Sequence, residues 1–285
     1  MKLFAALLVL CLPVIAAADE PAPEPLIPVA ILGSSPVLDA RADEWRGDAG
    51  TVLPLHPSTT EAASVIDARE LLLKVGRFDD QVLVYVEWRD DQPDLLHKPY
   101  VWDDMSGRYV RGVEREDRLA LQFEISGDYS TDWLSGNQFV ADMWHWKASR
   151  SNPLGLAHDK LTRISATKLL RSYRTQDKQG RPLYILRESD AGDPLYRTLL
   201  YGRKDQPVMP KYVLAQAPSG SVADVRAYGE WRDGFWRVEL LRKLDTGHDD
   251  DVRFARGKMV RAGIAVFDRS ENPDHMLTQT LRIQF

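Results

Sequence analysis

One short stretch near the middle of the chain gathers side chains that can bind a metal cofactor. Met143, His145 and Lys147 stand at alternate positions, with Trp144 and Trp146 between them. In a β-strand alternate side chains point to the same face, so the first three would share one face and the tryptophans the other. Methionine, neutral histidine and neutral lysine can each donate a lone pair to haem iron. The spacing therefore predicts a haem site beside bulky aromatic side chains.

The same residues also have a purely structural interpretation. Tryptophans at alternate strand positions usually belong to a core, and a histidine between them is usually hydrogen-bonded there. If the tryptophans were exposed, they would instead stack on sugar rings, as in a carbohydrate- or other ligand-binding β-sandwich module without haem. The three donors on one face favour haem, because sugar stacking does not need them.

Short strands must position this segment, since alternating apolar runs dominate the rest of the chain. A strand, an Asp-Asp turn and a second strand are predicted over 71–88. Further alternating runs cover 118–125, 235–241, 260–267 and 277–285. Many short strands with turn signals between them predict an all-β, antiparallel sandwich.

The domain organisation follows from composition. Residues 19–30 are rich in proline and acidic, which predicts an extended linker. One domain is expected over 31–285, and about 160–225 of it is a polar, less regular insertion. A short helix is expected within 154–170.

The beginning of the sequence has the three parts of a secretory signal. A positive Lys2 precedes an apolar stretch from Leu3 to Ile15, and three alanines end at Ala18. We therefore expect a cleavable signal peptide over 1–18, a periplasmic location, and no membrane-embedded segment after cleavage. Cleavage would also remove Cys11, which is the only cysteine of the 285 residues.

Several functions are excluded or disfavoured. With one cysteine, the chain cannot form the Cys-x-x-Cys-His run of a covalent c-type haem, or the ligand set of a cysteine-bound iron–sulfur cluster. A net charge of −5 and the absence of a basic tract argue against a nucleic-acid surface. No nucleophile elbow, zinc-protease motif, phosphate loop or dinucleotide fingerprint is found, so we expect a protein that is not an enzyme.

The run from Asp142 to Gly155 is the most specific part of the sequence. It reads Asp-Met-Trp-His-Trp-Lys-Ala-x-Arg-x-Asn-Pro-x-Gly. It resembles the cytochrome c-552/DMSO reductase-like haem-binding domain family, which includes the gamma subunit of ethylbenzene dehydrogenase. The haem subunits of dimethyl-sulfide dehydrogenase and of chlorate and selenate reductases belong to the same family. Weaker similarity is found over 37–45, 116–123 and 254–268.

This resemblance implies an immunoglobulin-like β-sandwich, similar to DOMON and carbohydrate-binding domains, with a non-covalent haem b at one edge. Members pass electrons to or from a redox partner and do not transform a substrate themselves. The resemblance thus implies an exported electron-transfer protein. Its partner would be a molybdenum-type oxidoreductase or a membrane cytochrome.

The axial ligands are the open part of this prediction. Several members carry a methionine shortly before the Trp-x-Trp segment, whereas residues 133–137 here contain none. Either another residue replaces that ligand, or haem has been lost in this member. His145 is the first candidate ligand, because it is the strongest donor at neutral pH. Met259 or Lys258 is the candidate on the opposite side, and Met143 is the alternative.

An acidic run near the C-terminus offers a different chemistry. Residues 245–251 read Asp-Thr-Gly-His-Asp-Asp-Asp, and such oxygen ligands suit calcium. The run lacks the spacing of an EF-hand loop, so a solvated turn is the favoured interpretation. A calcium site near Asp249–Asp251 is left open.

Overall fold

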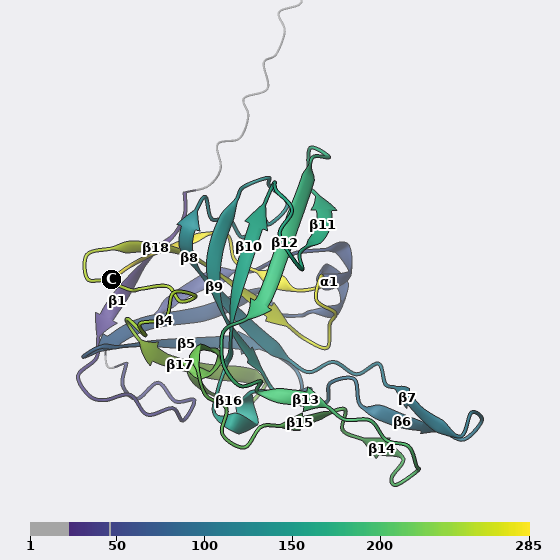
Figure 1. The fold of residues 1–285 in the computed structure, drawn as a ribbon. Helices are drawn as coiled ribbons and strands as arrows, with labels where there is room; N and C mark the ends of the chain where they lie inside the picture. The colour runs from purple at the N-terminus through teal and green to yellow at the C-terminus, as the bar shows by residue number, and fades with distance from the viewer. Residues whose placement is uncertain (1–22, 46) are drawn as a thin grey trace, which may run out of the picture.

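The computed structural model describes residues 23–285 apart from residue 46, and nearly all regular structure in them is β (Figure 1). The α-helix in this part of the chain is α1 (Thr60–Val65), which Thr59 caps by accepting a hydrogen bond from the Ala62 amide. Two 3-10 turns follow later, η1 (Asn152–Leu154) and η2 (Ser221–Ala223). Among the described residues no helix is long and apolar enough to cross a membrane. The predicted signal peptide lies outside the described residues.

One layer of the molecule, which we call the site sheet, carries the Trp-x-Trp segment at its centre. Its strands run in the order β11-β12-β10-β9-β8-β18-β20, all antiparallel, and the short strands β19 and β3 extend it beside β18. The bounds are β3 (His56–Pro57), β8 (Arg118–Gly127), β9 (Phe139–Lys147), β10 (His158–Ser165), β11 (Tyr173–Gln176), β12 (Pro182–Ser189), β18 (Met259–Phe267), β19 (Met276–Leu277) and β20 (Leu281–Gln284).

The second layer, the back sheet, consists of β4, β5, β17 and β16, with β2 at the edge of β4. Its bounds are β2 (Thr51–Pro54), β4 (Glu70–Phe78), β5 (Gln81–Arg89), β16 (Arg226–Arg232) and β17 (Phe235–Lys243). The hairpin expected over 71–88 is confirmed as β4–β5. Its turn places Asp79 at φ 51°, a left-handed conformation that aspartate tolerates in turns.

Strand β1 (Leu26–Ile31) joins the two layers. Its first half pairs in parallel with β20, and its second half pairs in parallel with β4. The expectation of an extended linker over 19–30 is therefore wrong for its last residues, because residues 26–30 pair with β20 and β4, which lie far from them in the chain. The all-β sandwich itself is confirmed.

The core lies between the layers. Trp144 and Trp146 of β9 have no exposed surface. Trp146 meets Trp88 and Trp236 from the back sheet, and Trp144 packs against Phe123 and Phe254. The Trp146 ring lies edge-on to Trp236, with 4.9 Å between ring centroids. Burial of such large rings supplies much of the free energy that holds two sheets together.

The middle of the chain differs from the expectation. The segment within 154–170 forms β10 instead of a helix, and β10 to β12 continue the site sheet up to Ser189. The remainder supports only small sheets: β13 (Tyr196–Thr198) pairs with β15 (Tyr212–Leu214). Strand β14 (Val208–Met209) adds to the projecting hairpin β6 (Tyr100–Asp103) and β7 (Arg108–Arg111), seen at the right of Figure 1. The irregular insertion is thus shorter than predicted, and starts after β12.

Candidate functional site

The outer face of β9 carries the three predicted donors. Met143, His145 and Lys147 lie together on the face that points away from the sandwich core, as the alternation predicted. All three are nevertheless buried, because loops cover this face. Their cross-strand neighbours in β8 are, in order, Gln122, Ala120 and Arg118.

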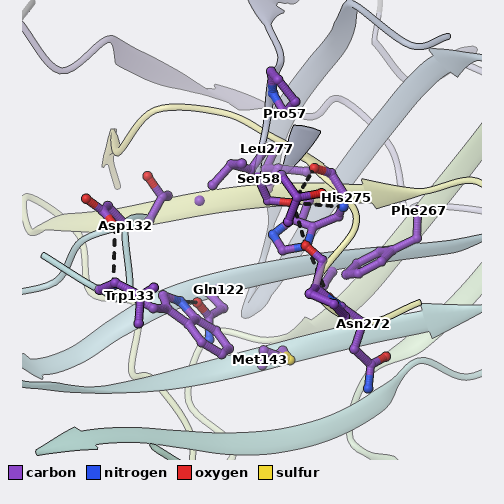
Figure 2. Close-up of a pocket in the computed structure, with 18 of the residues that line it drawn as sticks. Pro57, Ser58, Gln122, Asp132, Trp133, Met143, Phe267, Asn272, His275 and Leu277 are labelled. Carbon is purple, nitrogen blue, oxygen red and sulfur yellow. Dashed lines mark hydrogen bonds between the residues drawn. The ribbon is translucent and has the colours of Figure 1, made fainter. Parts of the chain in front are cut away.

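A cavity of about 510 Å³ opens over this face. Its floor includes Met143, Ala120 and Gln122, and the loop between β18 and β19 forms one wall with His275. Figure 2 shows Met143 on the sheet, the Trp133 indole to one side and Phe267 to the other. The volume lies within the ~300–1,000 Å³ range of small-molecule sites. We call this cavity the Met143 pocket.

The Trp133 wall of the pocket is fixed by a hydrogen-bond chain. The Trp133 Nε1 donates to Gln122 Oε1 at 3.1 Å, and Gln122 Nε2 donates to Thr162 Oγ1 at 3.0 Å. The Arg187 guanidinium lies over the Trp133 ring, 5.6 Å from its centroid, and its Nη2 is 4.0 Å from the Met143 sulfur. The pocket therefore combines a thioether, an aromatic wall and a cation.

His275 forms the opposite wall. The His275 ring lies against Phe267, with 4.9 Å between centroids, and its Nδ1 donates to the Asn272 carbonyl at 3.2 Å. Its backbone exchanges hydrogen bonds with Ser58 at the end of β3. Burial lowers the pKa of His275 to about 4, so the ring is neutral near pH 7. With Nδ1 occupied as a donor, Nε2 keeps the lone pair that a metal would use.

His145, the first candidate ligand, lies beside this pocket and is not among its lining residues. It is 4% exposed, its ring is 6.0 Å from that of Phe267, and neither ring nitrogen has a hydrogen-bond partner. Burial, reinforced by the charges of Lys147 and Arg118, lowers the pKa of His145 well below its usual value. An unpaired buried imidazole is uncommon in proteins.

Lys147 is already engaged by protein atoms. Its Nζ lies 2.7 Å from His158 Nδ1 and 3.3 Å from the Tyr196 hydroxyl. Burial, together with the charge of Arg150, lowers the pKa of Lys147 well below its usual range. His158 in turn contacts Ser189 through Nε2. Lys147, His158 and Ser189 thus form a chain of polar contacts across β9, β10 and β12.

The candidates from the C-terminal strand are not brought to this site. Lys258 and Met259 lie at the exposed start of β18, where Met259 pairs with Gln284. Met259 is 46% exposed and does not line the pocket. The second-ligand prediction requires correction, because the register that places β18 beside β8 brings Gly263, Ala265 and Phe267 to the site instead.

The two tryptophans are excluded from any surface role. Both point into the core and have no exposed surface, so they cannot stack on a sugar. A carbohydrate-binding function therefore cannot rest on stacking by Trp144 and Trp146.

The later part of the Asp142–Gly155 run organises the fold around the site. The Asn152 amide oxygen accepts hydrogen bonds from Trp146 Nε1 at 3.0 Å and from the Gly229 amide at 2.8 Å, and its nitrogen donates to the Gly229 carbonyl at 2.9 Å. Arg150 pairs through Nε with Glu116, whose carboxylate also accepts the Ser149 and Arg150 amides. These contacts hold the end of β9 against β16 of the back sheet and against the segment that leads into β8.

Four lining residues escaped the sequence reasoning: Trp133, Arg187, Phe267 and His275. Each comes from a different element, so no spacing along the chain relates them to Met143. His275 lies in a polar loop, where a single histidine gives no signal. Phe267 belongs to a predicted strand, and its alternation with Ala265 and Gly263 was the one usable hint.

Fold and site together define a class: a two-sheet β-sandwich with a partly apolar cavity on the outer face of one sheet. The chain belongs to the ethylbenzene dehydrogenase family, whose model matches residues 77–275. That span contains β9 and every lining residue discussed above except Ser58. No curated protein matches the chain.

Solved structures with similar folds are distant. A family 9 carbohydrate-binding module from Caldicellulosiruptor kristjanssonii, in complex with glucose, is 12% identical with a TM-score of 0.39, covering 90% of this chain and 85% of that one. A protein from Bacteroides uniformis, described as a candidate carbohydrate-binding protein, is 9% identical with a TM-score of 0.44, covering 91% of each chain.

Proposed function

We propose that this protein binds a non-covalent haem b in the Met143 pocket and exchanges electrons with a partner protein. The observation that carries the proposal is the meeting of Met143 and His275 in one cavity. A thioether and a neutral imidazole are the two side chains that most often hold haem iron in electron-transfer proteins. The narrower kinship with cytochrome c-552/DMSO reductase-like haem domains belongs to the same proposal.

The residues present fit such a group. Met143 and His275 would hold the iron, while Trp133 and Phe267 offer flat apolar walls for a macrocycle. Arg187 supplies a positive charge inside the pocket, which suits the carboxylates of haem. The haem, when bound, would supply a reversible one-electron centre. The chain's own residues would set its potential through ligand choice and burial.

His145 has a different place in this proposal from the one first expected. Its ring lies 6.0 Å from that of Phe267, its two nitrogens have no hydrogen-bond partner, and it does not line the cavity. We therefore assign the iron to Met143 and His275, with His145 as a neighbour of the bound group. The assignment is testable because the two histidines can be substituted separately.

The setting of the protein is part of the proposal. An exported, periplasmic location rests on the predicted signal peptide over 1–18. The partner would be a redox protein, either a molybdenum-type oxidoreductase or a membrane cytochrome. The open side of the Met143 pocket is the side through which electrons would pass.

Absorption spectroscopy tests the proposal. We expect the purified protein, mixed with haemin, to give a Soret band with sharp α and β bands on reduction. His275→Ala and Met143→Ala should each convert this spectrum to that of a haem with a missing axial ligand, whereas Met259→Ala, the matched control outside the pocket, should leave it unchanged. A wild-type protein that takes up no haemin would overturn the proposal. A change caused by His145→Ala and not by His275→Ala would overturn the ligand assignment.

A further inference from the structure

Four aspartates are buried together on the inner side of the site sheet. Asp142 lies in β9 and Asp159 opposite Trp144 in β10, while Asp190 follows β12 and Asp251 ends the acidic run 245–251. Their exposed fractions are 0% for the first two, 6% for Asp190 and 4% for Asp251. The acidic run was expected to be a solvated turn. That expectation is wrong for Asp251, although Asp249 does face solvent.

One buried cation faces this group among the residues that the structure describes. The Arg242 Nη1 is 2.6 Å from Asp142 Oδ2, 3.2 Å from Asp251 Oδ1 and 3.8 Å from Asp159 Oδ2. His248 approaches Asp251 only at 3.9 Å and is bonded to Asp224 near the surface. Four carboxyl groups face one guanidinium, and ionising all of them is costly in this buried position.

Five carboxylate oxygens in this cluster accept no hydrogen bond, although two of them, in Asp159 and Asp251, lie 3.8 and 3.2 Å from Arg242 Nη1. They are Oδ1 of Asp142, Oδ2 of Asp159, Oδ1 of Asp251 and both oxygens of Asp190. Asp190 differs from the other three, because its carboxyl group is buried and neither of its oxygens accepts a hydrogen bond from a donor in the described chain. One oxygen each from Asp142, Asp159 and Asp251 lie within 4.8 Å of one another. Oxygen ligands around one calcium ion, at ~2.3–2.6 Å from the metal, have such separations.

We propose that Asp142, Asp159, Asp190 and Asp251 bind one calcium ion. Calcium fits better than magnesium, because it accepts several carboxylates in an irregular arrangement, whereas magnesium keeps most of its water. Arg242 neutralises part of the negative charge of the cluster through its ion pairs with Asp142, Asp159 and Asp251. The ion would tie the β17–β18 loop and the end of β12 to β9, directly behind the strand that presents Met143. This site is separate from the Met143 pocket and does not depend on haem.

Calcium binding is measured on the whole chain. Trp144 Nε1 donates to Asp142 Oδ2 at 3.3 Å, so Trp144 lies close enough to sensitise the luminescence of bound terbium. We expect terbium luminescence that calcium displaces, with one site by calorimetry. A hundredfold excess of calcium over its Kd should raise Tm by roughly 5–10 °C compared with EGTA, and magnesium should do much less.

The variant Asp190→Asn tests the ligand assignment. It should lose the calcium-dependent rise in Tm, yet in EGTA it should be at least as stable as the wild type, because a buried carboxyl group whose oxygens accept no hydrogen bond has been replaced by a neutral amide of the same size. The matched control is Asp90→Asn, which alters a buried aspartate of a different acidic group and should keep the full calcium response.

Two results would overturn the proposal. One is a wild-type Tm that is the same in calcium and in EGTA, with no displaceable terbium signal. The other is an Asp190→Asn variant that responds to calcium as the wild type does. If Asp190→Asn failed to fold, the terbium and Tm measurements on the wild type would still decide.

Discussion

A single added methyl group at Gly229 should disturb the tryptophan core behind the candidate site. Gly229 lies in β16, opposite Val238, and its missing side chain points at Trp146. A Cβ at this position would lie 2.5 Å from Trp146 Cζ2 and 2.8 Å from Trp146 Cε2. Atoms cannot remain so close, so either the ring or the strand must shift.

The Trp146 ring has no free space into which it could move. It has no exposed surface, and it is held edge-on between Trp236 and Trp88 while its Nε1 donates to Asn152. Overpacking of this kind costs about 1–3 kcal/mol, and we expect the upper end because the ring is rigid and pinned. Replacing glycine with alanine also restricts the unfolded chain, which returns about 0.5 kcal/mol.

The net effect of Gly229→Ala is thus a loss of about 2 kcal/mol in the free energy of unfolding. For a chain of this size that corresponds to a fall in Tm of roughly 4–8 °C, measured by thermal unfolding. Gly202→Ala is the control, because no atom lies within 4 Å of its added Cβ; it should change Tm little.

A double-mutant cycle tests the cause. Trp146→Phe shortens the ring, so the loss in Gly229→Ala should be at least 1 kcal/mol smaller in the Trp146→Phe background, on the order of typical couplings between touching residues. Additive losses, or a Tm of Gly229→Ala equal to that of the wild type, would refute the reasoning.

Two further predictions concern the same core. Asn152→Ala leaves the Gly229 backbone and Trp146 Nε1 without their hydrogen-bond partner. It should lower the free energy of unfolding, measured by urea denaturation, by about 2–4 kcal/mol. An unchanged midpoint would contradict the structural role assigned to Asn152. Burial, reinforced by the charge of Asp90, raises the pKa of Asp117 to about 8. In the unfolded chain the same carboxyl ionises near its ordinary value. The free energy of unfolding is therefore highest below about pH 4, and it falls as the pH rises towards 8. Asp117→Asn should therefore gain on the wild type by about 3–4 kcal/mol between pH 5 and pH 8, and a pH-independent difference between the two unfolding free energies would contradict this.

The outline of the sandwich could be predicted because its signals are local. Alternation over 71–88 and 118–125 fixes which side chains are buried, and each pattern stands within a single strand. The same alternation correctly separated Met143, His145 and Lys147 from Trp144 and Trp146. The prolines near β1 led to the prediction of a linker there, because the sequence around them does not reveal the pairing of β1 with β20 and β4, which are distant in the chain.

The sequence by itself determined the sandwich and the two faces of β9, since a period of two is imposed by backbone geometry. Only the tertiary structure decided which residues share a cavity with Met143. His275 meets it through the β18–β19 loop and Arg187 through β12, whereas Met259 is carried away by the register of β18. The physical reason is that pocket and cluster arise from contacts between strands far apart in the chain, and such contacts leave no period to read along it.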